Sequence, residues 1–229
     1  MSSVDKKLQR TEKLVKAGVK DAKATMDALH KVKQHLESFG NVRDLPLDEN
    51  EKRQIQDLSL LTAKPVLYVC NVDDASAATG NAYSAKVIDF LKGQHAEGLI
   101  IAARLESEIA DLDSEEDRME FLNDAGLQEP GVDRLVRSAY SLLNLCSFFT
   151  VGPKEIKAWT IHKGMTAPQA AGVIHSDLER GFIRAEVMKY HDFITLKSEQ
   201  ACKEKGKFFV EGKNYVVGDG DILHIRFNV

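Results

Sequence analysis

Apolar residues recur with a helical period from residue 3 to residue 39. Lys, Glu, Gln and Asp fill the intervening positions, and Gly18 interrupts the pattern. One apolar face contains Val4, Leu8, Thr11 and Val15, and a second contains Ala22, Met26, Leu29, Val32 and Leu36. Two charged helices that each carry a narrow apolar stripe predict an antiparallel helical hairpin, an arm that buries little surface.

Another helix is predicted after Pro46, because Asp48 and Glu51 have the spacing of a capping box ahead of Ile55. Two interpretations of this helical region, residues 1–62, stay open. It is an ordinary structural coiled coil, or it is a dedicated arm that binds RNA or protein.

The pattern changes in residues 64–145. Val66–Cys70 and Leu99–Ala102 are continuous apolar runs, as expected for strands buried on both faces. The helix between them should bury one side, with Ala82, Ala85, Ile88 and Leu91. A strand, a helix and a strand at this spacing predict a βαβ unit of a parallel α/β sheet. Two strands do not make a stable parallel sheet, so we expect this domain to be incomplete without strands from elsewhere.

Two further helices are predicted in this region. One covers residues 114–125, opened by Ser114 and closed by Gly126, and the other covers residues 132–144.

Residues 147–229 are predominantly β in pattern, with a single helix expected at Ala167–Arg180. Asp219-Gly220 reads as a hairpin turn before the last strand. The expected strands are Ser147–Val151, Ile156–Ile161, Phe182–Tyr190, Phe208–Val210, Tyr215–Val217 and Ile222–Phe227. Strands around one helix in about eighty residues predict a β-grasp, ubiquitin-like domain, a fold that does not by itself give a function.

Composition narrows the class of protein. The chain has 229 residues, 43% hydrophobic and 29% charged, with a net charge of −4, which fits one to three small globular domains. It contains neither an apolar run long enough to span a bilayer nor the apolar core of a secretory signal. Three cysteines are too few for a disulfide framework or a zinc site, so we expect a cytoplasmic protein.

Charge is unevenly distributed. Residues 97–133 contain two Arg and twelve acidic side chains, whereas residues 1–40 are basic. Any contact with nucleic acid must therefore be local, although a solvated charged face explains such patterns as well. The seven histidines lack metal-ligand spacing, Cys70 reads as a buried strand residue, and Trp159 reads as core.

Candidate chemistry lies where the first buried strand ends. Asn71 and Asp74 follow this strand, and ligands of open α/β sheets bind at the carboxyl ends of strands. An asparagine offers a donor and an acceptor to a purine edge, and a carboxylate accepts from ring or exocyclic N–H groups. The alternative is an Asx-turn that simply leads the chain out of the strand.

The second strand strengthens the nucleotide interpretation. It runs into Ala102, Ala103 and Arg104, where small residues let backbone amides approach a base. Two adjacent strand ends of this kind match the purine pocket of a P-loop GTPase fold. Glu106 and Glu108 fit a helix start or a solvated acidic face equally well. The 229 residues contain no Gly-x-x-x-x-Gly-Lys-Ser/Thr, so nothing obvious cradles a triphosphate or holds magnesium.

Four long runs resemble one family. They are Leu60–Val72, Phe148–Thr160, Ala167–Glu186 and Asp219–Val229. Together they resemble the YchF, or Obg-like ATPase, family of P-loop NTPases and cover nearly the whole chain. The resemblance implies a helical arm at 1–62, the C-terminal half of a G domain at 63–145 and a TGS domain at 146–229.

The resemblance also implies a translation-associated NTPase that prefers ATP to GTP and binds ribosomes or ribosomal subunits. RNA contacts through the arm and the TGS domain are implied, and neither membrane binding nor DNA specificity is expected. Asn71 would meet the base and Val72 would contact the nucleotide. Val72 stands where GTPases have Lys, and Asp74 stands where the family has Glu. The base preference, ATP or GTP, therefore stays open.

The phosphate-binding loop and the magnesium ligands of the family lie ahead of the arm. We therefore expect this chain to be part of a longer protein, or the product of a shortened gene, and to be inactive alone. The competing hypothesis is a non-catalytic module that presents the arm and the TGS domain to RNA, ribosome or protein. A purely structural remnant is the third.

Overall fold

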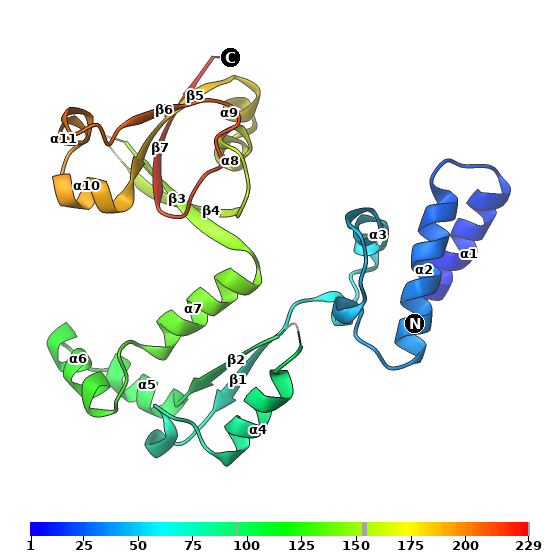
Figure 1. Ribbon diagram of the computed structural model, residues 1–229, viewed down its shortest axis with the longest axis horizontal. Helices are drawn as coiled ribbons and strands as arrows, with labels where there is room; N and C mark the ends of the chain where they lie inside the picture. The colour runs from blue at the N-terminus through cyan, green and yellow to red at the C-terminus, as the bar shows by residue number, and fades with distance from the viewer. Residues whose placement is uncertain (95, 153–154, 229) are drawn as a thin grey trace. The chain divides into compact units, whose positions relative to one another are not determined.

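A computed structural model describes residues 1–94, 96–152 and 155–228. The chain divides into two compact units, Met1–Ser138 and Ala139–Val229 (Figure 1). Pro153, Lys154 and Val229, which belong to the runs that resemble the family, lie outside the described residues, as does His95. The three-part division at residues 62 and 145 stays a prediction.

The helical hairpin at the start of the first unit agrees with the apolar pattern. Helices α1 (Ser2–Lys16) and α2 (Ala22–Glu37) pack side by side (Figure 1). Val4, Leu29 and Val32 are fully buried between them. Gly18 has φ +71°, a left-handed conformation that glycine adopts without strain, and it lies in the turn between the helices.

The capping box after Pro46 is confirmed. Helix α3 (Glu49–Ile55) begins at Asp48, whose side chain accepts from the backbone N–H of Glu51 at 2.8 Å. The Glu51 carboxylate accepts in turn from the Asp48 N–H at 3.0 Å. Short 3-10 helices surround α3: η1 (Val42–Asp44), η2 (Gln56–Leu58) and η3 (Leu61–Ala63).

A βαβ unit follows, as the sequence predicts. Strand β1 (Leu67–Asn71) pairs in parallel with β2 (Glu97–Ile101), and helix α4 (Ala82–Leu91) connects them. The register places Asn71 opposite Ile101. The carboxyl ends of the two strands therefore lie next to each other.

The expectation that both strands are buried on two faces is wrong. Within the described residues β1 pairs with β2 alone, no β1 side chain is buried, and Val69 is 47% exposed. The buried residues of α4 are Ser84 and Leu91, whereas Ala82 and Ala85 are exposed. One helix cannot cover both faces of a two-stranded sheet, so apolar strand residues remain open to solvent.

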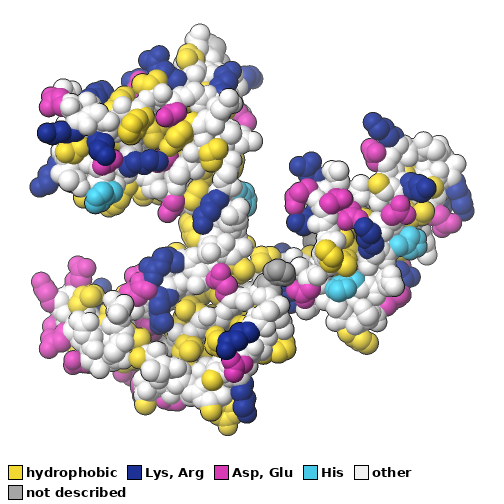
Figure 2. All heavy atoms as spheres, in the orientation of Figure 1, with side chains coloured by type: hydrophobic (Ala, Val, Ile, Leu, Met, Phe, Trp, Pro, Cys, Tyr) yellow, Lys and Arg dark blue, Asp and Glu magenta, His cyan; other side chains and the backbone are white. Residues whose placement is uncertain are grey.

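Helices predicted after β2 are present. Helix α6 (Glu115–Asp124) starts at Ser114, whose hydroxyl accepts from the N–H of Asp117, and α7 covers Gly131–Leu142. A 3-10 turn, η4 (Asp74–Ser76), and a helix absent from the sequence expectations, α5 (Ala103–Ala110), complete this part. A small core joins them, formed by Ala77, Ala102, Ile109, Leu122 and Leu127. Acidic side chains gather over α6 (Figure 2).

The second unit contains one five-stranded sheet in the order β4-β3-β7-β5-β6. The central strands β3 and β7 are parallel, and the other neighbours are antiparallel. The strands are β3 (Leu145–Val151), β4 (Ile156–His162), β5 (Phe182–Lys189), β6 (Phe209–Glu211) and β7 (Asp221–Phe227).

Three expectations for the second unit are wrong. The single helix expected at Ala167–Arg180 is two, α8 (Ala167–Ile174) and α9 (Ser176–Arg180), because His175 is extended at φ −162°. Helices α10 (Tyr190–Leu196) and α11 (Glu199–Glu204) were not expected, because their short apolar patterns resemble loops. The strand expected at 215–217 is one bridge between Val216 and Thr166, so Asp219-Gly220 does not close a hairpin.

A closed core fills one side of this sheet. Phe148, Ala185, Val187 and Leu223 are at most 1% exposed. Trp159 packs against them while partly exposed. The expected mixture of α and β structure is thus confirmed. Among the described residues no helix is both long enough and apolar enough to cross a membrane.

Candidate functional site

The expected site residues lie where β1 and β2 end. The backbone N–H of Val72 donates to the Ile101 carbonyl at 2.9 Å, which extends the strand pairing by one residue. Immediately beyond, the Asn71 Oδ1 atom accepts from the N–H of Ala103 at 3.0 Å. The polar end of one strand therefore meets the first residue of α5, which follows the other strand.

Only one of the two polar groups of the Asn71 amide forms a hydrogen bond with a described residue. Its oxygen is bonded to Ala103, whereas its Nδ2 group donates no hydrogen bond within the part of the chain that the structure describes. The side chain is exposed. An exposed amide with an available donor, and an oxygen that keeps a second lone pair, can bind a planar heterocycle by its edge.

Asp73 forms the turn that follows β1. Its carboxylate accepts from the N–H of Ser76 at 3.1 Å and from the Ser76 hydroxyl at 2.9 Å. The Asx-turn considered for Asn71 is therefore made by Asp73, because this residue caps η4. Asn71 and Asp74 are left for other contacts.

Asp74 forms an ion pair with Arg104 across the strand ends. Arg104 Nη2 bonds to Asp74 Oδ2, and Arg104 Nε lies 3.9 Å from Glu108. The hydrogen bond to Asp74, followed by the attraction of the Asp74 and Glu108 charges, raises the pKa of Arg104. Asp74 is 29% exposed and Arg104 76% exposed, so solvent reaches the pair.

Val72 and Ala102 lie below these polar groups. Ala102 is 1% exposed and belongs to the core under η4, and Val72 packs partly buried against that core. The structure therefore brings all six expected residues to one place, with two facing inward and four at the surface. Val72 and Ala102 support the strand ends from beneath.

Glu106 has a role that sequence reasoning missed. Its carboxylate accepts from the N–H of Gly131 at 2.7 Å and lies 4.0 Å from Arg134, and its side chain is 14% exposed. It lies in the first turn of α5, as the helix-start interpretation has it, and it also connects α5 to the start of α7; it is not part of a solvated face. Nothing local signals this, since the partner is 25 residues away.

A hollow of about 340 Å³ lies beside Asn71 along β1 and the start of α4. Asn81 and Tyr83 line it, and Tyr83 is 79% exposed. Asn81 holds the start of α4 by accepting from the N–H groups of Tyr83 and Ser84, both at 3.0 Å. Its sequence signal was an asparagine after glycine at a helix start.

Other candidate chemistry finds little support. Across residues 1–94, 96–152 and 155–228, no three His, Cys, Asp or Glu side chains come together in a way that could hold a metal ion. Cys70 is half-buried, whereas Cys146 and Cys202 are buried, and burial raises the pKa of both thiols. A raised pKa disfavours the nucleophilic thiolate.

Comparisons with known proteins agree on one family. The chain matches the family model YchF-GTPase_C, described as "Protein of unknown function (DUF933)", over residues 145–228. It is 46% identical over 231 residues to the "Ribosome-binding ATPase YchF" of Bacillus subtilis and 45% identical over 229 residues to that of Escherichia coli O157:H7. All of this chain is covered, but it spans 63% and 62% of those relatives.

Solved structures give the same result. The chain is similar to the Schizosaccharomyces pombe YchF GTPase with a TM-score of 0.83 and 32% identity, over 98% of this chain and 61% of that one. A GTP binding protein from Pyrococcus horikoshii has a TM-score of 0.52 at 17% identity, over 90% of this chain and 57% of that one, which is similarity of fold alone.

Proposed function

Because the chain belongs to the YchF family, we propose that it supplies base recognition to a ribosome-associated, nucleotide-hydrolysing protein. The observation that carries this proposal is the contact between Asn71 and the Ala103 N–H at the strand ends. Relatives named ribosome-binding ATPases support the choice of ligand and partner. A ribosomal role would place the protein in the cytoplasm.

The polar groups at the strand ends suit the edge of a purine. An asparagine amide pairs with the N6 and N7 positions of adenine through one acceptor and one donor. Within the described residues Asn71 has its Nδ2 donor available, and its Oδ1 atom, which accepts from the Ala103 N–H, keeps a second lone pair for a base amino group. Asp74 and Arg104 would lie at the rim, while Val72 and Ala102 hold the two strand ends together.

We assign phosphate binding and hydrolysis to groups outside these 229 residues. A bound ATP or GTP with Mg²⁺ would supply the phosphoryl group that is hydrolysed, held by a glycine-rich loop and its Lys and Ser/Thr. The 229 residues contain no segment with that spacing, and no described carboxylates converge on a metal position. We therefore assign base recognition and no hydrolysis to this chain alone.

We further assign a β-grasp TGS domain to residues 146–229, a G-domain half to 63–145 and a coiled-coil arm to 1–62. A mixed sheet with a parallel central pair, and helices packed on its core, supports the first assignment. The family model matches residues 145–228, so its match begins at nearly the same boundary.

Titration of the ¹⁵N-labelled chain with ATP tests base recognition. Without phosphate contacts we expect a dissociation constant of about 1 mM, which corresponds to roughly −4 kcal/mol. The Ala103 amide signal should shift, and Asn71→Ala should remove the shift. The matched control is Asn123→Ala on the exposed surface of α6, which should bind as the wild type does. Unchanged binding by Asn71→Ala would refute the assignment.

A second candidate function is a non-catalytic module that binds ribosomal RNA. One observation favours it: Lys6, Arg10 and Lys13 lie on the face of α1 opposite its buried stripe. None of the three forms an ion pair with any described residue. Three adjacent uncompensated cations are suited to a phosphate backbone.

Co-sedimentation with ribosomes at several salt concentrations tests this candidate. The slope of log K against log salt is negative, and each lost phosphate contact reduces its magnitude by about 0.7–0.9. Replacing Lys6, Arg10 and Lys13 by Gln should therefore reduce that magnitude by about 2–3. Replacing Lys92 alone, directly after α4, should leave the slope unchanged. Salt-insensitive binding, or equal slopes for the triple variant and the wild type, would exclude this surface.

A further inference from the structure

The Asp74–Arg104 pair joins the two strand ends at the rim of the proposed base site. Asp74 belongs to η4 after β1, and Arg104 to the first turn of α5 after β2. The pair occupies Oδ2, one of the two oxygens of the Asp74 carboxylate. Asn71 and Ala103 make their own contact next to it, so the strand ends stay joined without the ion pair.

Guanine and adenine differ in the hydrogen bonds that they can form with a carboxylate. Guanine presents two adjacent donors, the N1–H and the N2 amino group, and both oxygens of one carboxylate are needed to accept from them. Adenine has an acceptor at N1 and no amino group at C2, so it gains nothing from that carboxylate. A carboxylate with one oxygen already bonded to a cation is a poorer acceptor for guanine and is neutral toward adenine.

We propose that Arg104 determines base specificity by holding the guanine-reading carboxylate of Asp74, which leaves adenine as the favoured base. This inference rests on the proposed base site. An aspartate at position 74 would by itself suit guanine, and the ion pair with Arg104 would offset that preference. The carboxylate suited to guanine is present but is engaged.

The contact has no evident structural duty that competes with this role. Arg104 is 76% exposed and contacts Asp74 and Glu108, both of which are at least partly exposed. The core beneath, around Ala102 and Ile109, does not include the Arg104 side chain. Removing the guanidinium should therefore free Asp74 without disturbing α5.

The experiment measures binding of AMP, IMP and GMP to the ¹⁵N-labelled chain, in the wild type and in Arg104→Gln. The three ligands share one ribose phosphate, so ratios of their dissociation constants report the base. Loss of an exposed ion pair should favour GMP over AMP by about 2- to 5-fold. IMP, which has the N1–H but lacks the 2-amino group, should gain less.

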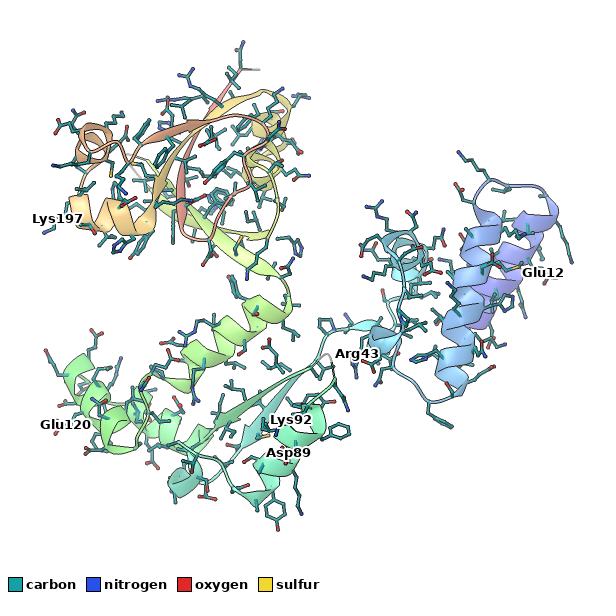
Figure 3. All side chains as sticks on the ribbon, in the orientation of Figure 1. Glu12, Arg43, Asp89, Lys92, Glu120 and Lys197 are labelled. Carbon is teal, nitrogen blue, oxygen red and sulfur yellow. The ribbon has the colours of Figure 1, made fainter. Side chains whose placement is uncertain are left out.

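Three variants isolate the cause. Asp74→Asn removes the ion pair together with the carboxylate, so GMP should gain nothing. Arg104→Lys retains a cation and should stay close to the wild type. Lys92→Gln removes another solvent-exposed ion pair, Lys92–Asp89 at 2.7 Å at the end of α4, and should change no ratio (Figure 3).

Two results would overturn the role of Arg104 while leaving base recognition intact. One is an unchanged GMP to AMP ratio in Arg104→Gln. The other is an equal gain in Asp74→Asn, because the carboxylate would then not be the group that reads guanine. If none of the nucleotides shifts the Asn71 and Ala103 signals of the wild type, the base site itself is refuted, and the specificity role with it.

Discussion

The two sheets of this protein differ in how they are covered. The five-stranded sheet of the second unit packs a continuous core, with Phe148 and Ala185 fully buried. The two-stranded sheet of the first unit leaves Val69 47% exposed and buries no side chain of β1, all of whose residues the structure describes. The five-stranded sheet buries its apolar side chains within its own unit, whereas the two-stranded sheet leaves apolar side chains exposed.

This difference separates stability from chemistry. The proposed base site lies on the poorly covered sheet, where strand ends and polar groups are reachable. The well-covered sheet packs a closed core and contributes none of the six residues of the proposed site. Segments that bind ligands are commonly drawn from the less stable part of a protein.

The largest expected difference comes from removing one apolar side chain from each sheet. Phe148→Ala should destabilise the second unit by about 3–5 kcal/mol, because it opens a cavity in a closed core. Val69→Ala should cost about 0.5 kcal/mol or less, since that side chain is already exposed. Urea unfolding followed by fluorescence of Trp159, the single tryptophan, reports the second unit.

Hydrogen exchange of the β1 amides reports the first unit in the same samples. A loss from Val69→Ala that approaches the loss from Phe148→Ala would mean that β1 is covered in solution. The two regions would then not differ in the way described.

Two aspartates give the next largest contrast. Asp221 is fully buried and accepts from Lys189 Nζ at 2.5 Å, from Tyr215 Oη at 2.6 Å and from the Gly218 N–H at 2.8 Å. Asp221→Asn should cost about 3 kcal/mol, because it leaves a buried network incompletely satisfied. Asp74→Asn breaks a solvent-reached pair and should cost no more than about 1 kcal/mol.

Denaturant midpoints of the two variants, measured in one buffer, decide this point. Equal losses would show that Asp74 stabilises the fold. The specificity role proposed for Arg104 would then have to be separated from that structural contribution.

The sequence predicted some elements of the fold and missed others. Local signals succeeded where partners are close in the chain: the stripe from Val4 to Val15, and the capping box of Asp48 and Glu51. They failed at His175, whose extended backbone splits a helix that the apolar pattern predicts to be continuous. The His175 Nδ1 atom accepts from the N–H of Asp177 at 3.2 Å and caps the second helix, a contact that apolar periodicity does not report.

The candidate site shows the same limit. Asn71 and Asp74 could be chosen from the sequence because they follow an apolar strand. Their contacts with Ala103 and Arg104 span 32 and 30 residues, beyond the reach of spacing arguments. The identity of the turn-forming residue, Asp73, depended on which of three neighbouring polar side chains turns back toward the chain.

A smaller effect, dependent on pH, is expected from Glu186 in the well-covered sheet. Its carboxylate accepts two hydrogen bonds from Arg226, at 3.1 and 3.0 Å, and these bonds lower its pKa against the opposing effect of burial. A lowered folded-state pKa means that the stabilisation is complete above the unfolded value, about 4.3, and is lost as the pH falls toward the folded value.

Glu186→Gln should therefore cost about 1–2 kcal/mol at pH 7, and the gap to the wild type should close below about pH 4. Unfolding monitored at Trp159 across pH 3–7 measures this gap. A gap that is constant with pH would assign the loss to packing, and the charge of Glu186 would not matter.

The smallest change in the free energy of unfolding is expected at Val69 on β1, and the same position should have the largest effect on self-association. Within the described residues β1 has one unpaired edge, and exposed apolar strands of this kind pair with other chains. Val69→Lys should change the free energy of unfolding by about 0.5 kcal/mol or less, yet weaken self-association of the chain in sedimentation velocity at high concentration. Val173→Lys, at a 42% exposed position on helix α8, is the matched control and should leave association unchanged. If the wild type stays monomeric at every concentration, or if Val69→Lys associates equally well, the open strand is not an association surface. The exposure of β1 would then matter for ligand access alone.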